Sequence, residues 1–456
     1  MVEMKASLQA QRNYFATGIT RELPFRMHML QRLEKVIRKH EADILGALRK
    51  DLNKSEFEGY MTELGMVYEE LRFMKKHLAQ WAKPKRVQTP LTNFRATSRI
   101  YSEPYGVVLI ISPWNYPFLL AIAPLIGAIA AGNCAVVKPS EYSKNVSELI
   151  SVIIMEAFEA SYIQAIPGGS EVGKALLEER FDYIFFTGST LVGRAVLKAA
   201  SRHLTPVSLE LGGKSPCIVD ETANLELAAK RIVFGKFLNA GQTCVAPDYL
   251  LVHREVKDQL LRSMKKYILQ FYGKEPGVNS EFPKIINEKH FHRLLGLLDG
   301  NHVFYGGRSY PKSHRIEPTI LDGVAWDSAI MKEEIFGPIL PVIEFTELKE
   351  IVNTIQQLPK PLALYYFTRD KEREGYVLKN TSYGGGCIND TIVHLASSYL
   401  PFGGVGESGM GGYHGKASFD TFSHRKSVLK KSNLIDIPLR YPPYGNRIRL
   451  LKKVLK

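Results

Sequence analysis

One cysteine of this chain lies in a setting that favours a reactive thiol. Cys244 occurs within residues 239–248, a string of small and polar residues, whereas Cys134, Cys217 and Cys387 occur in apolar or glycine-rich strings. The thiolate is the nucleophilic form of cysteine, and a polar loop permits it where an apolar core does not. A buried structural thiol is the commoner fate of a cysteine, and we assign it to the other three. Cys244 is therefore the candidate nucleophile.

A carboxylate and an amide stand at positions that suit reaction at a carbonyl group. Glu210 lies near the end of the apolar run 207–211 and precedes two glycines, so it can face a cleft and activate water as a general base. Asn115 lies between Pro113 and Pro117, which restrain its backbone and suit its amide to a fixed donor for developing negative charge. The residues alone leave open a surface role for Glu210 and favour a turn-forming role for Asn115.

A glycine-bounded turn is the candidate site for a phosphate group. The run 183–187 leads into Gly188 and Ser189, and Gly193 follows in the next helix. Glycines let the backbone approach a pyrophosphate, and a helix N-terminus offers free N–H groups. The spacing is neither the Rossmann nor the Walker motif, so an ordinary strand–helix connection stays open. Lys138 and Glu141 likewise follow a strand-like run, where a ligand site and a solvated loop are both compatible with the sequence.

Length and composition indicate a folded protein of more than one domain. The chain has 456 residues, of which 45% are apolar and 23% charged, and a chain of this length does not form one compact core. The four cysteines are widely scattered, so we predict no metal site, and they are typical of a reducing, cytoplasmic compartment. The N-terminus lacks the apolar core and cleavage site of a secretory signal.

The net charge of +14 is concentrated near the C-terminus. From His424 onward there are ten Lys or Arg residues and only Asp436 in opposition, so the remainder of the chain is nearly balanced. No RNA-binding signature or Cys/His finger accompanies this charge, so we predict no nucleic-acid binding. The longest uncharged run, 105–137, is interrupted by prolines and asparagines. It is interpreted as a buried strand, a helix over 121–131 and a second strand, not as a membrane span.

Hydrophobic periodicity predicts an α/β fold with two halves. Residues 1–82 alternate apolar and charged positions at helical spacing, and residues 83–101 are extended after a proline-containing break. Short apolar runs then alternate with helices, which is typical of parallel crossover units in a doubly wound sheet. The two series of strands meet near residue 210. The first comprises 107–111, 134–137, 162–166, 183–187 and 207–211, and the second 215–219, 249–252, 339–345 and 363–367.

Seven strings in this chain resemble, in the same order, the motifs of the aldehyde dehydrogenase family. They are 113–117 (PWNYP), 138–141 (KPSE), 186–189 (FTGS), 210–216 (ELGGKSP), 241–244 (GQTC), 332–338 (KEEIFGP) and 400–406 (LPFGGVG). The resemblance extends over essentially the whole chain. The short N-terminus, together with residues 246–249 and 408–416, resembles the class-3 branch, which includes the fatty aldehyde dehydrogenases.

The resemblance implies NAD(P)-dependent oxidation of aldehydes to carboxylic acids. Cys244 would form a thiohemiacetal and then a thioester, the Asn115 amide and the Cys244 backbone N–H would bind the oxyanion, and Glu210 would activate the hydrolytic water. The implied cofactor-binding residues are Lys138 and Glu141 for the adenosine ribose, Gly188, Ser189 and Gly193 for the pyrophosphate, and Glu334 with Phe336 for the nicotinamide ribose. Glu141 would repel a 2′-phosphate and Lys138 would soften that repulsion, so we expect NAD as cofactor with NADP tolerated.

The resemblance also implies three structural parts. These are a Rossmann-like NAD(P)-binding domain (residues 1–82 and 101–209), an α/β catalytic domain (210–424), and a small β oligomerisation arm with a C-terminal tail (83–100 and 425–456). The arm implies a homodimer. Residues 447–456 are basic and amphipathic, which is compatible either with weak binding to an anionic membrane surface or with a solvated last helix.

The sequence does not select one aldehyde. The N-terminal helices and the region after Tyr383 should frame the entrance, and an apolar tunnel there would favour medium- or long-chain aliphatic or aromatic aldehydes. The candidate side chains, each of which could equally belong to the core, are Phe15, Tyr60, Met61, Tyr68, Ile392 and Leu395. Two other interpretations stay open: an acylating or semialdehyde-specific enzyme, and a non-catalytic protein of the same fold. The retention of Cys244, Glu210 and Asn115 weakens the second.

Overall fold

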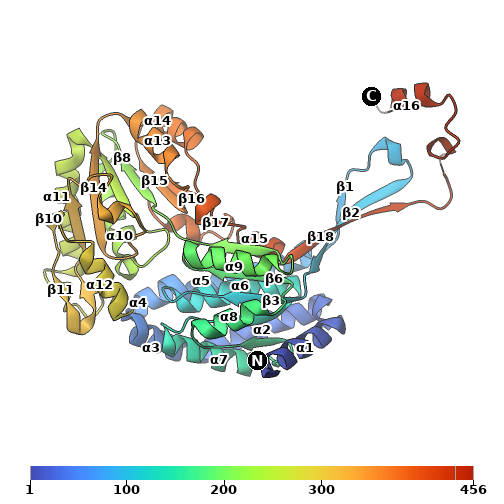
Figure 1. The fold of residues 1–456 in the computed structure, drawn as a ribbon, viewed down its shortest axis with the longest axis horizontal. Coiled ribbons are helices and arrows are strands. Elements are labelled where there is room, and N and C mark those ends of the chain that lie inside the picture. Colours follow the sequence, from blue (N-terminus) through green and yellow to red (C-terminus); the bar gives the residue numbers. More distant parts are fainter. Residues whose placement is uncertain (1, 437, 455–456) are drawn as a thin grey trace.

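Two helix-covered sheets form the body of the protein, and a third, antiparallel sheet projects from it (Figure 1). The computed structural model describes residues 2–436 and 438–454. Helices and parallel strands alternate along most of the chain. The predicted α/β class, with a doubly wound sheet, is confirmed.

The first sheet has six strands in the order β17-β7-β6-β3-β4-β5, of which all but β17 are parallel. Their bounds are β3 Val107–Ile111, β4 Cys134–Lys138, β5 Ile163–Ala165, β6 Tyr183–Thr187, β7 Val207–Glu210 and β17 Gly409–Met410. The strands are short, continuous apolar runs because helices bury both faces of a parallel sheet. The strand order reverses at β3, and ligands of open α/β sheets bind outside the carboxyl ends of the strands at such a point.

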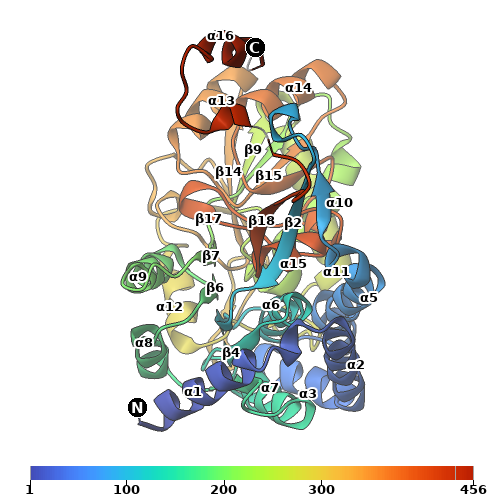
Figure 2. The same cartoon turned by 90° about the vertical axis from the view of Figure 1, so that its right-hand side faces the viewer.

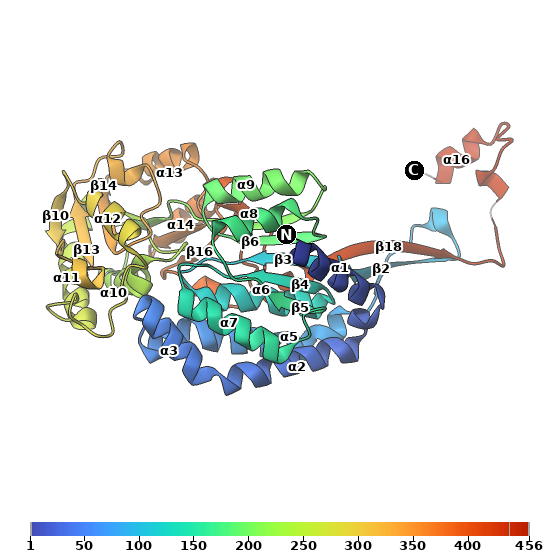
Figure 3. The same ribbon diagram turned by 60° about the horizontal axis from the view of Figure 1, so that its bottom comes forward.

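Helices cover this sheet on both faces. Figure 3 shows α8 (Ser170–Glu178) and α9 (Thr190–Ser201) on one side of the strands, with α6 (Pro117–Ala131) and α7 (Lys144–Ala157) on the other. The predicted N-terminal helices form a further layer, part of which packs against α6 and α7. They are α1 Val2–Ala16, α2 Leu23–Lys39, α3 Glu41–Leu52, α4 Glu56–Gly59 and α5 Gly65–Trp81, with a π-helical turn, Tyr60–Leu64, between α4 and α5.

The uncharged run 105–137 forms the predicted strand, helix and strand. Helix α6 begins at Pro117, four residues before the predicted start, because the Glu63 carboxylate accepts the N–H groups of Phe118 and Leu119 at 2.9 and 3.3 Å. Every residue of α6 is buried. Within the described part of the chain, no helix is both long and apolar enough to cross a bilayer.

The second sheet has seven strands in the order β10-β13-β14-β9-β8-β15-β16, all parallel except β10. Their bounds are β8 Pro216–Val219, β9 Tyr249–His253, β10 His302–Tyr305, β13 Thr319–Asp322, β14 Ile339–Phe345, β15 Ala363–Phe367 and β16 Gly385–Ile388. The accompanying helices are α10 Leu225–Phe237, α11 Lys257–Tyr272, α12 Glu288–Gly296, α13 Leu348–Gln357 and α14 Lys371–Asn380, and a small hairpin joins β11 Ser309–Tyr310 to β12 Arg315–Ile316. The chain passes from the first sheet to the second between Glu210 and Pro216.

The projecting sheet pairs segments that are far apart in the sequence. Strand β2 (Ala96–Pro104) lies between β1 (Lys85–Val87) and β18 (Ser423–Lys431), antiparallel to both. Helix α15 (Lys416–Thr421) leads from the body into β18, and the last helix, α16 (Ile448–Val454), lies beyond the end of the arm, as Figures 1 and 2 show.

Candidate active site

Cys244 follows a strained turn at the end of α10. Asn239 and Ala240 both have φ of 51°, in the left-handed region that non-glycine residues rarely adopt. Gly241 follows with φ of 73°, and a Cβ at this position would lie 2.2 Å from the carbonyl oxygen of Gly337. Only glycine therefore fits at this position of the turn, three residues before the cysteine.

The thiol of Cys244 opens into a cavity of about 180 Å³ that Glu210 also lines. Cys244 is half-buried and is therefore accessible from this cavity. The other walls are mostly apolar. They include Met61, Met66, Leu119, Leu120, Phe234, Leu238, Ile392, Val393, Leu395, Ala396 and Phe402. Of the residues expected at the entrance, Met61, Ile392 and Leu395 line this cavity, whereas Phe15, Tyr60 and Tyr68 do not.

The other three cysteines have different surroundings. All four cysteines are free. Cys134 and Cys217 are fully buried within β4 and β8. Cys387 is half-buried on β16, with its sulfur 3.6 Å from Nδ1 of His394, and burial lowers the pKa of that imidazole to about 4. A neutral imidazole does not stabilise a thiolate, so Cys387 lacks the environment of an activated cysteine.

Glu210 is the last residue of β7 and lines the cavity. The side chain is 3% exposed, and neither carboxyl oxygen has a hydrogen-bond partner in the described part of the chain. Burial raises its pKa well above the ordinary value, because a desolvated carboxylate is costly. The backbone around it is fixed, since Gly188 N–H donates to the Glu210 carbonyl at 3.0 Å and β17 pairs with β7 at this residue.

The electrostatic environment of Cys244 disfavours the resting thiolate. Burial, followed by the negative charges of Glu334 and Glu210, raises the thiol pKa to about 12. The backbone N–H groups of Cys244 and Val245 donate to the sulfur and partly oppose this shift. The resting nucleophile is therefore a thiol near two carboxyl groups.

Asn115 is held against the cysteine loop, although it does not line the cavity itself. Its Nδ2 donates to the carbonyl oxygen of Gln242 at 3.0 Å, two residues before Cys244. The neighbouring Tyr116 hydroxyl is hydrogen-bonded to Thr243 at 2.6 Å. An amide nitrogen carries two hydrogens, so one N–H of Asn115 is used in the loop and the other is available.

The predicted ribose and pyrophosphate residues follow the two strands that flank β3. Lys138 ends β4, and its ammonium lies 2.9 Å from the Glu141 carboxylate. After β6, the Ser189 hydroxyl accepts the Val192 N–H and caps α9. Gly193 lets α9 approach the sheet, because a Cβ there would lie 2.6 Å from Cδ2 of Leu211.

Gly188 and this capped helix start lie at the carboxyl edge of the sheet, at the point where the strand order reverses. A Cβ at Gly188 would lie 2.5 Å from the Phe186 ring, so the turn has room only for backbone. This backbone cradle at a helix N-terminus fits a pyrophosphate, and the Glu141 carboxylate fits a ribose hydroxyl.

Glu334 and Phe336 precede β14 and face the junction of the sheets. The Glu334 carboxylate accepts the Gly213 N–H, and burial with the nearby Asp248 raises its pKa to about 8. Phe336 has φ of 51° and packs edge-on against Trp114, with ring centroids 5.3 Å apart. A cavity of about 320 Å³ reaches from Thr190, the first residue of α9, to Glu334. The cavity thus joins the start of α9 to the predicted nicotinamide-ribose residue.

Sequence reasoning missed several charged residues around the site. Lys236 is fully buried on α10, its Nζ has no hydrogen-bond partner among the described residues, and burial lowers its pKa to about 8. Lys54, Glu58 and Glu63 bond the two loops that carry Asn115 and Cys244. All four stand among charged or helical neighbours in the sequence, so no local signal separates them from solvent-exposed residues. In the described part of the chain, no cluster of His, Cys, Asp and Glu is placed to hold a metal ion.

Known proteins resemble this chain over almost its full length. The chain is 51% identical over 445 residues to the 4,4'-diaponeurosporen-aldehyde dehydrogenase of Staphylococcus aureus, with 97% of each protein covered. It is 46% identical to the dimeric NADP-preferring aldehyde dehydrogenase of Canis lupus familiaris, covering 97% of this chain and 98% of that protein. Further relatives are named as aldehyde dehydrogenase family 3 members, which supports the predicted class-3 branch.

Solved structures of aldehyde dehydrogenases also resemble this chain over most of its length. The substrate-bound state of Staphylococcus aureus AldH superposes with a TM-score of 0.98 at 49% identity and covers 99% of both chains. An NAD-dependent aldehyde dehydrogenase from Sinorhizobium meliloti superposes with a TM-score of 0.86 at 25% identity, covering 95% of this chain and 88% of that one. The model of the aldehyde dehydrogenase family matches residues 3–428. The chain therefore belongs to the aldehyde dehydrogenase family, oxidoreductases that oxidise aldehydes with NAD or NADP.

Proposed function

We propose that this enzyme oxidises apolar aldehydes to carboxylic acids by covalent catalysis at Cys244. The observation that carries the proposal is the shared cavity, which both Cys244 and Glu210 line and whose other walls are mostly apolar. An aldehyde carbon is electron-poor and does not readily release hydride, whereas the tetrahedral adduct of a thiolate does. A cysteine and a carboxylate therefore divide one difficult reaction into two easier ones.

The first half of the reaction forms and oxidises a thiohemiacetal. The Cys244 thiol releases its proton to solvent water, and its sulfur attacks the carbonyl carbon, converting the C=O double bond into a C–O⁻ single bond. The oxyanion re-forms the carbonyl as the C–H bond breaks, and the hydrogen leaves with its electron pair. A nicotinamide held beside Glu334 and Phe336 would supply the acceptor for this hydride. A thioester between the acyl group and Cys244 remains.

The second half hydrolyses the thioester. Glu210 takes a proton from a water molecule, the hydroxide attacks the acyl carbon, and the C–S bond breaks with the sulfur as leaving group. Burial raises the pKa of this carboxyl group above its ordinary value, which is the direction that makes a carboxylate a stronger base. The presence of this base favours release of the acid over transfer of the acyl group to coenzyme A.

The oxyanion needs donors that are fixed before the charge develops, each worth about 3 kcal/mol in such sites. We assign this role to the Asn115 side-chain amide and the Cys244 backbone N–H. The bond from Asn115 to the Gln242 carbonyl supports the assignment, because it ties the amide to the loop that carries the nucleophile.

The cofactor residues are assigned by their positions at the carboxyl edge of the first sheet and in the loop that precedes β14 of the second sheet. Lys138 and Glu141 would bind the adenosine ribose, Gly188, Ser189 and Gly193 the pyrophosphate, and Glu334 the nicotinamide ribose with Phe336 beside it. We propose NAD as the preferred cofactor, since the Glu141 carboxylate opposes a 2′-phosphate. Its ion pair with Lys138 reduces this opposition and leaves NADP tolerated. A kcat/KM ratio of NAD to NADP below one would contradict this preference.

The apolar cavity walls favour medium- or long-chain aliphatic or aromatic aldehydes. Burial of each additional methylene contributes about 0.8 kcal/mol, so affinity should rise with chain length until the cavity is filled. The Staphylococcus aureus relative is itself named for an aldehyde substrate, 4,4'-diaponeurosporen-aldehyde. The free cysteines suit a reducing compartment, so we place the enzyme in the cytoplasm.

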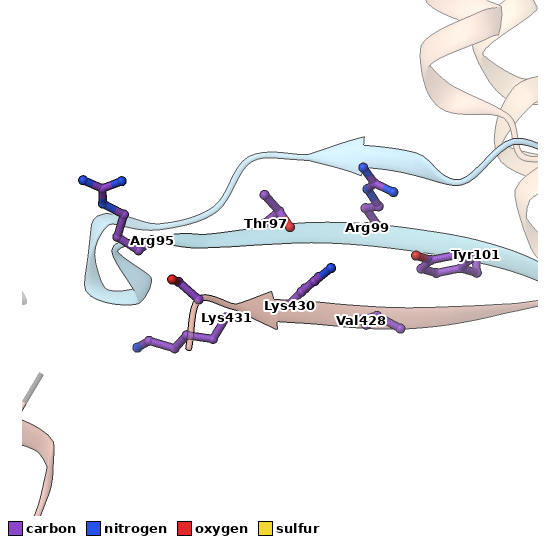
Figure 4. A pocket seen from close by; sticks show the side chains of 8 residues that line it. Arg95, Thr97, Arg99, Tyr101, Val428, Lys430 and Lys431 are labelled. Atoms are coloured by element: carbon purple, nitrogen blue, oxygen red, sulfur yellow. The ribbon is translucent and has the colours of Figure 1, made fainter. Parts of the chain in front are cut away.

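We propose that the arm joins two copies of the chain into a homodimer. The outer edge of β18 pairs with no strand in the described part of the chain, and Val428 and Leu429 are exposed on it. An open edge strand is a template for pairing with another chain. One face of the arm carries a shallow groove lined by basic side chains of β2 and β18, as Figure 4 shows. The canine relative is named as dimeric. A sedimentation mass equal to one chain of 51.4 kDa would contradict the dimer.

The basic tail supports a further proposal of weak contact with an anionic membrane surface. In α16 the exposed apolar residues Ile448 and Leu451 accompany Arg449, Lys452 and Lys453. This helix lies beyond the end of the arm (Figure 1), where a flat surface could reach it. A short helix with an apolar side and several cations binds such surfaces weakly.

The roles of Cys244 and Glu210 predict different kinetic defects. Cys244→Ala should abolish aldehyde oxidation, because no thiohemiacetal forms. Glu210→Gln should retain a burst of about one NADH per active site and then turn over at least about 100-fold more slowly, since only hydrolysis loses its base. Stopped-flow NADH absorbance with aldehydes of graded chain length measures both effects. Equal loss of burst and turnover in Glu210→Gln would place the carboxylate in the first half-reaction instead.

The charges around the thiol predict the pH dependence of its alkylation. Because the pKa of Cys244 is raised to about 12, alkylation by iodoacetamide should accelerate about tenfold per pH unit below that value. Glu334→Gln removes a negative charge that raises this pKa, so Cys244 should react several-fold faster at about pH 9, where Glu334 is ionised. The neighbouring, exposed Glu333→Gln is the matched control. An unchanged rate in Glu334→Gln would show that this carboxylate does not influence the thiol.

Truncation tests the proposed membrane contact. Deleting residues 447–456 should reduce co-sedimentation with vesicles that contain anionic lipid and leave NADH formation from a soluble aldehyde unchanged, because the tail is remote from the cavity. Vesicles of neutral lipid are the control, and neither protein should sediment with them. Co-sedimentation that the deletion does not change would remove the proposal.

A further inference from the structure

A fully buried ion pair lies behind the proposed oxyanion site. The Lys54 ammonium and the Glu63 carboxylate are 2.6 Å apart, and both side chains have 0% exposure. Lys54 lies between α3 and α4, and Glu63 lies in the π-helical turn that precedes α5. Removing two charges from water costs free energy, and a buried ion pair is weak evidence for a stabilising role. The further contacts of the two side chains therefore indicate what the pair does.

Lys54 bonds the backbone of the oxyanion residue. Its Nζ donates to the carbonyl oxygen of Asn115 at 3.1 Å and lies 3.9 Å from the ring centroid of Tyr116. The Asn239 side-chain amide donates to the same carbonyl oxygen at 2.8 Å. The Asn115 peptide is thus held by the N-terminal helical layer and by the loop that carries Cys244.

The same helical layer also bonds the cysteine loop. Glu58 on α4 accepts the backbone N–H of Asn239 at 2.9 Å, where the chain has left-handed backbone. Glu63 completes the connection, because its second oxygen accepts two N–H groups at the start of α6, next to the Asn115 loop. Three side chains, Lys54, Glu58 and Glu63, therefore connect the two loops that form the site.

We propose that Lys54, paired with Glu63, is a positioning residue that fixes Asn115 for oxyanion stabilisation. This inference rests on the oxyanion role of Asn115 in the proposed function. Lys54 contacts the main chain of Asn115 and acts through it. The reason is geometric: productive donors must be held within about 0.5 Å by the groups behind them. Tyr116 extends the effect, because the ammonium faces its ring while its hydroxyl bonds Thr243, the residue before the nucleophile.

A double-mutant cycle tests this role. Lys54→Met with Glu63→Gln removes both charges of the pair and keeps an oxygen acceptor for the start of α6. It should lower the single-turnover rate of hydride transfer about tenfold or more, with little change in the Kd for NAD. In the wild-type enzyme, Asn115→Ala should lower the rate of hydride transfer about 100-fold. In the Lys54→Met/Glu63→Gln enzyme, here called the paired variant, the same substitution should lower the rate by clearly less than that factor. Such non-additivity is expected for groups that act as one unit.

A matched control separates positioning from general destabilisation. Lys75→Met removes an ion pair with Glu34 from the same helical layer, remote from the cavity, and should leave the hydride-transfer rate unchanged. Thermal unfolding of every variant accompanies the rates. If the paired variant does not fold, Lys54→Arg replaces it: the guanidinium keeps the charge but displaces the donor from the Asn115 carbonyl, so the rate should fall while stability is largely kept.

The outcomes distinguish this inference from the proposed function. Suppose that Asn115→Ala lowers the rate of hydride transfer but the Lys54→Met/Glu63→Gln variant keeps the wild-type rate. Lys54 then does not act through Asn115, and this inference fails while the proposed function stands. The same holds if the rate reductions of Asn115→Ala and of the paired variant multiply fully when the two are combined. A wild-type rate in Lys54→Arg has the same consequence. If Asn115→Ala itself leaves hydride transfer unchanged, the oxyanion assignment fails and the inference fails with it.

Discussion

The buried carboxyl group of Glu210 is the constraint on which the active site depends. A carboxyl group without a protein hydrogen-bond partner is costly to bury, yet β7 ends at this residue and delivers it to the cavity of Cys244. Strand pairing on both sides of β7 fixes its backbone. The unpartnered oxygens leave the base free to bond water, which is what thioester hydrolysis requires. Stability is thus given up locally so that the base remains available.

The nucleophile depends on the second sheet and on backbone strain. Two consecutive left-handed residues and Gly241 bring Cys244 to the cavity, and Gly337 contacts this turn from the loop before β14. The same loop carries Glu334, whose charge raises the thiol pKa. The thiol and a predicted cofactor residue are therefore not independent features, since one short loop touches the turn of the nucleophile and carries Glu334.

Local patterns predicted the body of the fold well, because buried parallel strands are short apolar runs such as those of β3, β6, β14 and β15. The predicted helix inside 105–137 began too late, because its first turn is capped by Glu63, more than fifty residues earlier. The long-range pairing of β2 with β18 and the two-residue strand β17 have no local pattern. The π-helical turn that places Glu63 is equally invisible in the sequence, because it differs from an α-helix only in its hydrogen bonds.

The residues of the candidate site could likewise be predicted only in part from the sequence. Cys244 and Glu210 were predicted from motifs, and the structure places both in one cavity. Lys54 could not be predicted, because a lysine between two helices ordinarily faces solvent, and its burial depends on a carboxylate and a carbonyl from other segments. The apolar cavity could be predicted only in part. Met61, Ile392 and Leu395 come from distant segments, and the sequence does not distinguish apolar residues that line a cavity from those that belong to the core.

Covalent attachment of the acyl group to Cys244 is the step on which the proposed reaction depends. The most direct measurement is mass spectrometry of Glu210→Gln enzyme, quenched in acid after one turnover with NAD and an aliphatic aldehyde. The peptide containing Cys244 should gain the mass of the acyl group, with one adduct per NADH formed. Formation of NADH without an adduct on this peptide, or with the adduct on another cysteine, would contradict the proposed reaction.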